Sequence, residues 1–112
     1  MKWSKYRAVK TEVDGILFDS KKEAKRYSEL KLLEKAGEIT QLELQPVFQC
    51  VVKEKKICSY RADFRYFDKK ATGTMGQMGT MMVEDVKGFK TPVYRLKKKL
   101  VEALFPVKIT EI

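Results

Sequence analysis

The segment 57–67 alternates between apolar and charged side chains, which restricts it to an extended strand with one buried face. Its apolar side chains occupy every second position, at Tyr60, Ala62, Phe64 and Tyr66. Charged residues fill the positions between them, including Asp63 between Arg61 and Arg65. Because successive side chains of a strand point to opposite faces, the aromatic face is predicted to be buried and the Asp63 face to be polar. Aspartate is disfavoured in the middle of a strand, so Asp63 is a candidate functional residue.

The residues before this strand predict a hairpin followed by a helix. The pair Asp14-Gly15 is typical of a hairpin turn, here between strands near 6–13 and 16–18. Ser20 is predicted to cap a helix that stops at Gly37, with Glu23 at the spacing of a capping box. The apolar residues that recur at helical spacing, and that we expect to face the core, are Ala24, Tyr27, Leu30 and Leu33.

The middle of the chain predicts further strands. The apolar, β-branched and aromatic residues of 42–52 indicate a strand, although Pro46 interrupts them and suits an edge or a strand start. The segment 71–80 contains three glycines and no charge, so we expect a flexible connection there. A further strand is predicted over 81–87.

The last part of the chain predicts a second helix and a final strand. Thr91 and Pro92 are typical of a helix start, and Pro106 ends the helix before a strand over 107–112. The helix face that we expect to be buried consists of Val93, Leu96, Leu100 and Leu104. The opposite, mostly basic face consists of Arg95, Lys98, Lys99 and Glu102.

The order hairpin, helix, three strands, helix, strand predicts an α/β (α+β) fold. Strands joined by short connections pair antiparallel, while the last strand returns through a helix, so the central sheet should be mixed. With 112 residues the chain is expected to be one domain, with a basic N-terminal arm and hairpin at 1–18 and a core at 19–112. No apolar run reaches the roughly 20 residues that span a bilayer, and no signal-peptide pattern follows the N-terminus. We therefore expect a cytoplasmic location with no membrane partner.

The residue types present restrict the chemistry of any active site. The chain has no histidine and only two cysteines, which excludes the usual zinc sites and histidine acid–base catalysis. No phosphate-cradling glycine fingerprint occurs, and no organic cofactor is expected. Cys50 and Cys58 are placed to lie opposite each other across a hairpin with its turn near Glu54, and we expect them to be reduced thiols.

Three carboxylates and one lysine form the candidate catalytic set. Asp85 and Lys87 project from the same face of a strand, while Glu84 points to the opposite face. Glu23 falls on the apolar stripe of its helix, where an acid is costly unless it is paired or bound to a cation. Converging carboxylates need a cation to stay ionised, and oxygen ligands favour Mg²⁺ or Mn²⁺. We therefore expect Asp63, Asp85 and Glu23 to hold a metal and Lys87 to act beside a phosphate or the attacking water.

Each of these residues also has a simpler explanation. Glu23 can be only a capping residue, worth on the order of 1 kcal/mol to its helix. Asp63 can be a surface residue that forms salt bridges with its flanking arginines. Asp85 and Lys87 can be an ordinary exposed ion pair, which contributes little to stability.

The net charge of +9 favours a polyanionic partner such as DNA. The basic residues that we expect to contact phosphates lie at the N-terminus and around the second helix: Lys2, Lys5, Arg7, Lys10, Lys90, Arg95, Lys98 and Lys99.

Three motifs in order resemble a small phage and prophage family, formerly of unknown function, that is placed in the PD-(D/E)XK nuclease superfamily. The resemblance runs over nearly the whole chain, and its motifs run from Asp14 to Ala24, from Tyr60 to Phe64 and from Glu84 to Gly88. Ala62 stands where the superfamily's name has a proline.

The resemblance implies a restriction-endonuclease-like αβββαβ core, here preceded by the N-terminal hairpin. It implies catalytic roles for Glu23, Asp63, Asp85 and Lys87, and it adds Gln45 of a Gln-Pro pair as a weaker candidate. Similar small phage members resolve DNA junctions, often as dimers, so a homodimer is a possible assembly. The implied setting is a phage- or prophage-encoded protein inside the bacterial host.

The leading hypothesis is therefore a Mg²⁺-dependent endodeoxyribonuclease that selects branched, flap or junction DNA by its shape. The alternative from another class is a non-catalytic DNA-binding protein of phage replication or recombination that keeps the nuclease fold. A third hypothesis is that the acids form a purely structural cluster on the surface.

Overall fold

The computed structural model describes residues 9–73, 76–86 and 90–112. The elements found in these residues follow the order β1 (Thr11–Val13), β2 (Ile16–Phe18), α1 (Lys21–Lys35), β3 (Ile39–Leu44), β4 (Val47–Val52), β5 (Lys55–Arg61), β6 (Phe64–Thr72), β7 (Met78–Asp85), α2 (Pro92–Leu104) and β8 (Ile109–Glu111).

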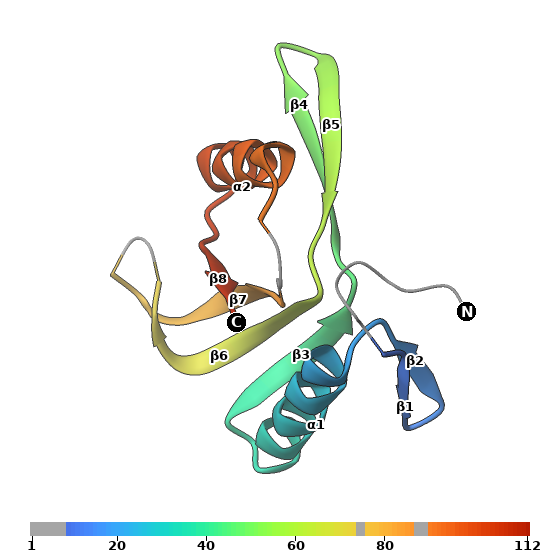
Figure 1. Cartoon of the computed structure of the whole chain (residues 1–112). Coiled ribbons are helices and arrows are strands. Elements are labelled where there is room, and N and C mark those ends of the chain that lie inside the picture. Colours follow the sequence, from blue (N-terminus) through green and yellow to red (C-terminus); the bar gives the residue numbers. More distant parts are fainter. Residues whose placement is uncertain (1–8, 74–75, 87–89) are drawn as a thin grey trace, which may run out of the picture.

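A four-stranded mixed sheet forms the centre of the molecule (Figure 1). Its strand order is β3-β6-β7-β8, and only the β7–β8 pair is parallel. The parallel pair is connected through α2, as a crossover requires. Two smaller two-stranded sheets, β1–β2 and β4–β5, complete the fold. The predicted α+β class with a mixed sheet is confirmed.

The predicted strand over 57–67 is wrong in one respect, because it is two strands that belong to different sheets. The break falls at Ala62 and Asp63, where the backbone changes partners. The Ala62 amide donates to the Pro46 carbonyl at 3.0 Å, and the Asp63 amide donates to the Glu84 carbonyl at 3.1 Å. The side-chain alternation continues through the break, since Ala62 and both flanking aromatic residues are buried. Asp63 therefore lies at a junction between sheets and not in the middle of a strand.

The predicted strand over 42–52 is divided in the same way, into β3 and β4. Gln45 adopts a left-handed backbone with φ of 53° before Pro46, which turns the chain out of the central sheet. Strands β4 and β5 then pair with each other as a two-stranded ribbon, hereafter the β4–β5 ribbon (residues 47–61). Cys50 and Cys58 are paired across this ribbon as free thiols, with the turn at Lys53 and Glu54, which confirms the predicted placement.

The predicted flexible connection over 71–80 is also wrong in its extent. Strand β6 continues to Thr72 and β7 begins at Met78, so both ends of the segment are strand. Gly79 permits this pairing, because its φ is 86° and a Cβ there would lie 2.7 Å from Cζ of Phe67. Strand β7 ends at Asp85, and the predicted continuation to Lys87 lies outside the described residues.

Helix α1 begins as predicted and packs its first turns on the sheet. The Ser20 hydroxyl accepts a hydrogen bond from the Glu23 amide at 3.1 Å. Ala24, Tyr27 and Leu30 are buried as expected, but Leu33 is exposed. Steps of three residues rotate a helix by about 300°, so a stripe at this spacing drifts by about 60° per step and has turned away at Leu33.

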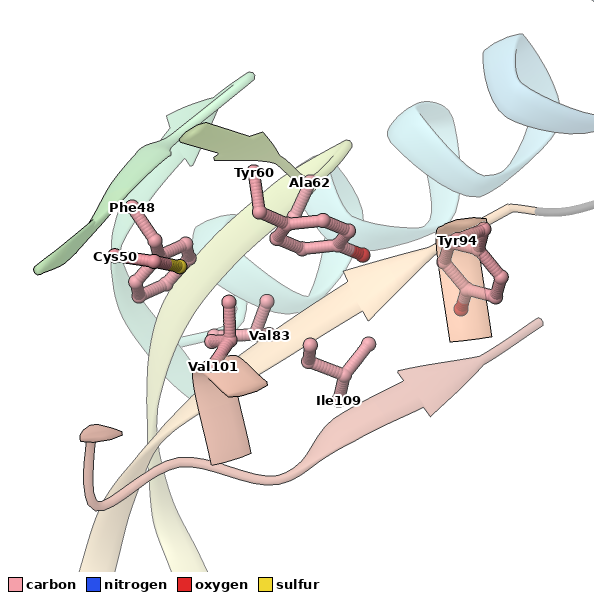
Figure 2. Packing of buried hydrophobic residues seen from close by; sticks show 8 residues of the cluster. All are labelled: Phe48, Cys50, Tyr60, Ala62, Val83, Tyr94, Val101 and Ile109. Atoms are coloured by element: carbon pink, nitrogen blue, oxygen red, sulfur yellow. The ribbon is translucent and has the colours of Figure 1, made fainter. Parts of the chain in front are cut away.

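Helix α2 is rotated by one residue from its predicted orientation. Val93 and Leu96 are 61% and 68% exposed and Leu104 is also exposed, whereas Tyr94 and Val101 are buried. Leu100, which was also predicted to face the core, is partly buried and packs against it. Figure 2 shows Tyr94 and Val101 with Phe48 and Tyr60 from the β4–β5 ribbon, and with Val83 and Ile109 from the sheet. The helix therefore faces a cluster that includes residues of the ribbon. The predicted orientation is wrong because the sequence pattern does not separate the ribbon from the central sheet.

No helix within the described ranges is long and apolar enough to cross a membrane.

Candidate active site

A cleft of about 250 Å³ lies between α1, the β1–β2 hairpin and the junction of β3 with β4. Its polar lining consists of Glu23, Gln45 and Asp63. Strand β2 and Leu44 supply the apolar wall. Three of the residues singled out from the sequence, which are separated by up to 40 positions, thus line one small cavity.

Glu23 enters this cleft from the first turn of α1. Its backbone amide is bonded to the Ser20 cap, while its side chain is buried. The capping position and the position in the cleft are therefore compatible. Capping alone does not explain why the carboxylate is buried. A capping residue can stay exposed to solvent, and burying a carboxylate is costly unless it has a partner.

Asp63 enters the same cleft from the junction between β5 and β6, and Asp85 affects the pKa of its carboxyl group. Its Oδ2 accepts a hydrogen bond from the Val86 amide at 2.6 Å. Burial raises the pKa of Asp63 to about 7, assisted by a hydrogen bond with Asp85 and by the charges of Asp85 and Glu23, against the opposing Val86 amide. Asp63 is therefore not held by its flanking arginines, and Arg65 instead bonds both oxygens of Glu43 at 2.7 Å.

Asp85 is fully buried at the end of β7. Its Oδ2 accepts a hydrogen bond from the Tyr60 hydroxyl, which comes from the base of the β4–β5 ribbon. Burial, followed by this hydrogen bond, raises the pKa of Tyr60, so the phenol stays protonated and keeps donating. The ring of Tyr94 lies 6.2 Å from that of Tyr60, and the Tyr94 hydroxyl donates to Glu111 at 2.8 Å. Asp85 is thus fixed by an aromatic network and is not an exposed ion pair.

Glu84 turns to the opposite face, as strand alternation predicts. Its carboxylate accepts hydrogen bonds from Arg26 Nε at 2.7 Å and Nη2 at 2.6 Å, and one from the Tyr66 hydroxyl. Only 2% of Glu84 is exposed. Arg26 lies one helical turn after Glu23, so this pair fixes α1 against the strand that carries Asp85.

Of the other predicted site residues, Asp85 is not among those that line the cleft, and several lie outside the described part of the chain. Lys87 lies outside the described residues, as do Lys2, Lys5 and Arg7. Lys90 and Lys98 form ion pairs with Glu111 at 3.1 Å and 3.6 Å. Two of the lysines expected to contact DNA are therefore already paired with a carboxylate. The remaining basic candidates, Lys10, Arg95 and Lys99, are exposed.

The acids suit a hard cation in chemistry but are not arranged as a complete metal site. Carboxylate and amide oxygens are ligands that Mg²⁺ accepts. In the part of the chain that the structure describes, no group of three acidic or cysteine residues has the arrangement of a metal site. The raised pKa of Asp63 means that near neutral pH a proton reduces the repulsion between Asp63 and Asp85.

Two residues that position the acids, Tyr60 and Arg26, were not predicted from the sequence. Tyr60 was assigned correctly to the buried face, but nothing local indicates that its hydroxyl reaches Asp85. Arg26 stands in a basic helix where many residues are exposed. Strand alternation directed Glu84 to the face opposite Asp85, and a carboxylate on a face that is buried is the signal that a cation must lie nearby.

The protein therefore has an α+β fold in which acidic side chains from α1, from the β5–β6 junction and from the end of β7 are buried or line the cleft. The chain belongs to the family described as protein of unknown function (DUF1064), whose model matches residues 3–112. No curated protein and no solved structure matches the chain.

Asp63→Asn is expected to stabilise the protein at alkaline pH. A folded-state pKa near 7, raised from 3.8, means that the folded protein binds more protons than the unfolded chain between these values. The stability contributed by this group is therefore lost as pH rises from about 4 to about 7. After a discount for partial exposure, the variant should be more stable at pH 8 by on the order of 1–2 kcal/mol, and about equal at pH 4. Urea unfolding at both pH values measures the difference, and equal stabilisation at both would contradict it.

Proposed function

We propose that this protein is a Mg²⁺- or Mn²⁺-dependent endodeoxyribonuclease that cuts branched or otherwise structured DNA. The observation that carries the proposal is the convergence of Glu23, Gln45 and Asp63 on one cleft, with the buried Asp85 near enough to help raise the pKa of Asp63. A buried acid whose pKa is raised by burial and by neighbouring acids is typical of functional sites. The net charge of +9 suits a polyanionic substrate.

The order of elements supports a restriction-endonuclease-like core, and with it the resemblance to the PD-(D/E)XK superfamily. Helix α1, strands β3, β6 and β7, helix α2 and strand β8 follow one another as αβββαβ, and the four strands are neighbours in one sheet. The β4–β5 ribbon is then an insertion between the first and second core strands.

The proposed mechanism gives each acid a role in holding the cation and the water. Asp63 and Asp85 would hold the metal, and Glu23 would hold it directly or through water. A bound divalent cation would polarise the scissile phosphate and lower the pKa of its water. Tyr60 holds Asp85 in position, and Lys87 orients or deprotonates the attacking water. Exposed Arg95 and Lys99 contact phosphates, and a homodimer would place two clefts on one branched substrate.

The test is a cleavage assay with labelled junction, flap and linear duplex DNA in Mg²⁺, Mn²⁺ or EDTA. We expect nicks that require either metal and that are more frequent on branched DNA. Cleavage that persists in EDTA would contradict the role of the acids.

The non-catalytic DNA-binding alternative is retained because of one observation. The described acids do not form a ready-made group of three metal ligands. Salt-sensitive DNA binding with no cleavage in either metal would favour this accessory role.

A further inference from the structure

We propose that the β4–β5 ribbon is a DNA-binding arm whose lysine-rich tip contacts the duplex about seven base pairs from the cleft. This inference rests on the proposed function for its substrate, but it concerns a surface outside the cleft. None of the ribbon's lysines was among the DNA-binding candidates identified from the sequence.

The base of the ribbon is attached directly to the cleft. Strand β4 begins two residues after Gln45, and β5 ends two residues before Asp63. The Gln45 amide donates to the Asp63 carbonyl at 2.9 Å, which closes the base. Tyr60, near the end of β5, bonds Asp85. A molecule bound along the ribbon would therefore lead into the acidic cleft.

The other end of the ribbon extends past α2, away from the four-stranded sheet (Figure 1). Helix α2 covers one face of the ribbon near its base, through Phe48, Cys50 and Tyr60. Beyond that contact all residues from Val51 to Ile57 are exposed, and Ile57 is 58% exposed. The tip is therefore free to contact a partner.

The exposed tip carries three lysines and one acid. Lys55 is paired with Val52 and Lys56 with Val51 across the strands, so these two lysines project from opposite faces. Among the described residues, no carboxylate lies within ion-pairing distance of Lys53, Lys55 or Lys56, in contrast to Lys90 and Lys98. Their charges are available to phosphates, and a two-stranded ribbon of this width fits the major groove.

The turn at the tip is unfavourable for the residues that form it. Lys53 and Glu54 have φ values of 49° and 68°, the left-handed backbone at which Asn-Gly is preferred in a two-residue hairpin. The chain places a lysine there at a cost in backbone strain. Such strain is typical of positions that serve a function.

The length of the ribbon sets the distance between the tip and the cleft. Lys56, the tip lysine nearest to the cleft along β5, lies seven positions before Asp63, which corresponds to about 23 Å of extended strand. At about 3.4 Å per base pair, this is roughly seven base pairs.

The test compares two variants that each lose three lysines. The ribbon variant combines Lys53→Ala, Lys55→Ala and Lys56→Ala. The matched control combines Lys25→Ala, Lys35→Ala and Lys69→Ala, which are exposed on α1 and β6 and change the net charge equally. Fluorescence anisotropy with a labelled duplex of about 30 base pairs, in EDTA, measures binding without cleavage.

We expect the ribbon variant to bind at least about 10-fold more weakly and the salt dependence of log K to fall by about two to three. The control should stay within about twofold of the wild type, since its lysines would make no phosphate contact. Hydroxyl-radical protection about seven base pairs from the cleft should disappear only in the ribbon variant.

Three outcomes would overturn the inference. Equal weakening of both variants would mean that only total charge matters. Unchanged DNA binding with self-association of the ribbon variant would mean that the lysines only prevent edge-to-edge pairing. Unchanged DNA binding with loss of a wild-type dimer, measured by sedimentation, would make the ribbon a protein interface. Because binding is measured in EDTA, a protein that never cleaves would refute the nuclease proposal and leave this test intact.

Discussion

Arg26→Met is expected to lower the free energy of unfolding by about 3–5 kcal/mol. The substitution leaves the Glu84 carboxylate buried between α1 and β7 without its guanidinium partner. A buried charge that loses its partner is far more costly than a broken surface pair. Urea denaturation followed by circular dichroism measures the change.

Arg65→Met is the matched control, since it breaks a two-oxygen contact of similar length with Glu43 at a half-exposed position. That variant should lose less than about 1 kcal/mol. The double variant Arg26→Met with Glu84→Leu should regain most of the loss, because no unpaired charge remains. Similar losses for Arg26→Met and Arg65→Met would mean that the buried pair does not hold α1 on the sheet.

Asp85→Asn is expected to reduce metal-dependent cleavage at least about 10³-fold, since several kcal/mol of transition-state stabilisation would be lost with the metal. Asparagine preserves the shape of the side chain and still accepts the Tyr60 hydrogen bond, so the fold should be retained. DNA affinity in EDTA should stay within about twofold. Single-turnover cleavage of the best branched substrate measures the effect.

The control for this prediction is Asp68→Asn on β6, whose carboxylate accepts hydrogen bonds from the Lys70 and Ala71 amides where the register with β7 shifts. This variant should cleave at a rate close to that of the wild type. Full activity of Asp85→Asn would remove Asp85 from the proposed metal site, and an unfolded variant would instead assign it a structural role.

The parts of the fold that depend on neighbouring residues could be predicted from the sequence. Ser20 caps α1, Asp14 and Gly15 form the hairpin turn, and Tyr60 and Tyr66 lie on a buried face. In each case the deciding interaction is local or follows from the period of the strand.

The parts that depend on distant backbone could not be predicted. The break at Asp63 arises because the backbone changes partner there. The chain just after β5 is bonded to Pro46, just before β4, whereas Asp63, just before β6, is bonded to Glu84 on β7. The rotation of α2 has a similar cause. Its apolar arc includes Tyr94 and Val101 as well as Val93 and Leu96, and only the position of the ribbon decides which half is buried.

The candidate site shows the same division. Strand alternation was enough to direct Glu84 away from Asp85, and helical spacing was enough to bury Glu23. The hydrogen bonds from Tyr60 and Arg26 join elements that meet only after folding, so no periodicity in the sequence predicts them.

Because the two ends of the β4–β5 ribbon meet at its base, where the Gln45 amide bonds the Asp63 carbonyl and the Ala62 amide bonds the Pro46 carbonyl, the length of the ribbon is separable from the architecture of the sheet. Residues added in pairs near Lys53 and Glu54 would preserve the inward and outward alternation below them. Each added pair per strand would move the tip by roughly 6.6 Å, about two base pairs. Under the proposed DNA-binding role, the length of the ribbon would set how far the molecule reaches along a bound duplex, and that length could be changed without altering the cleft.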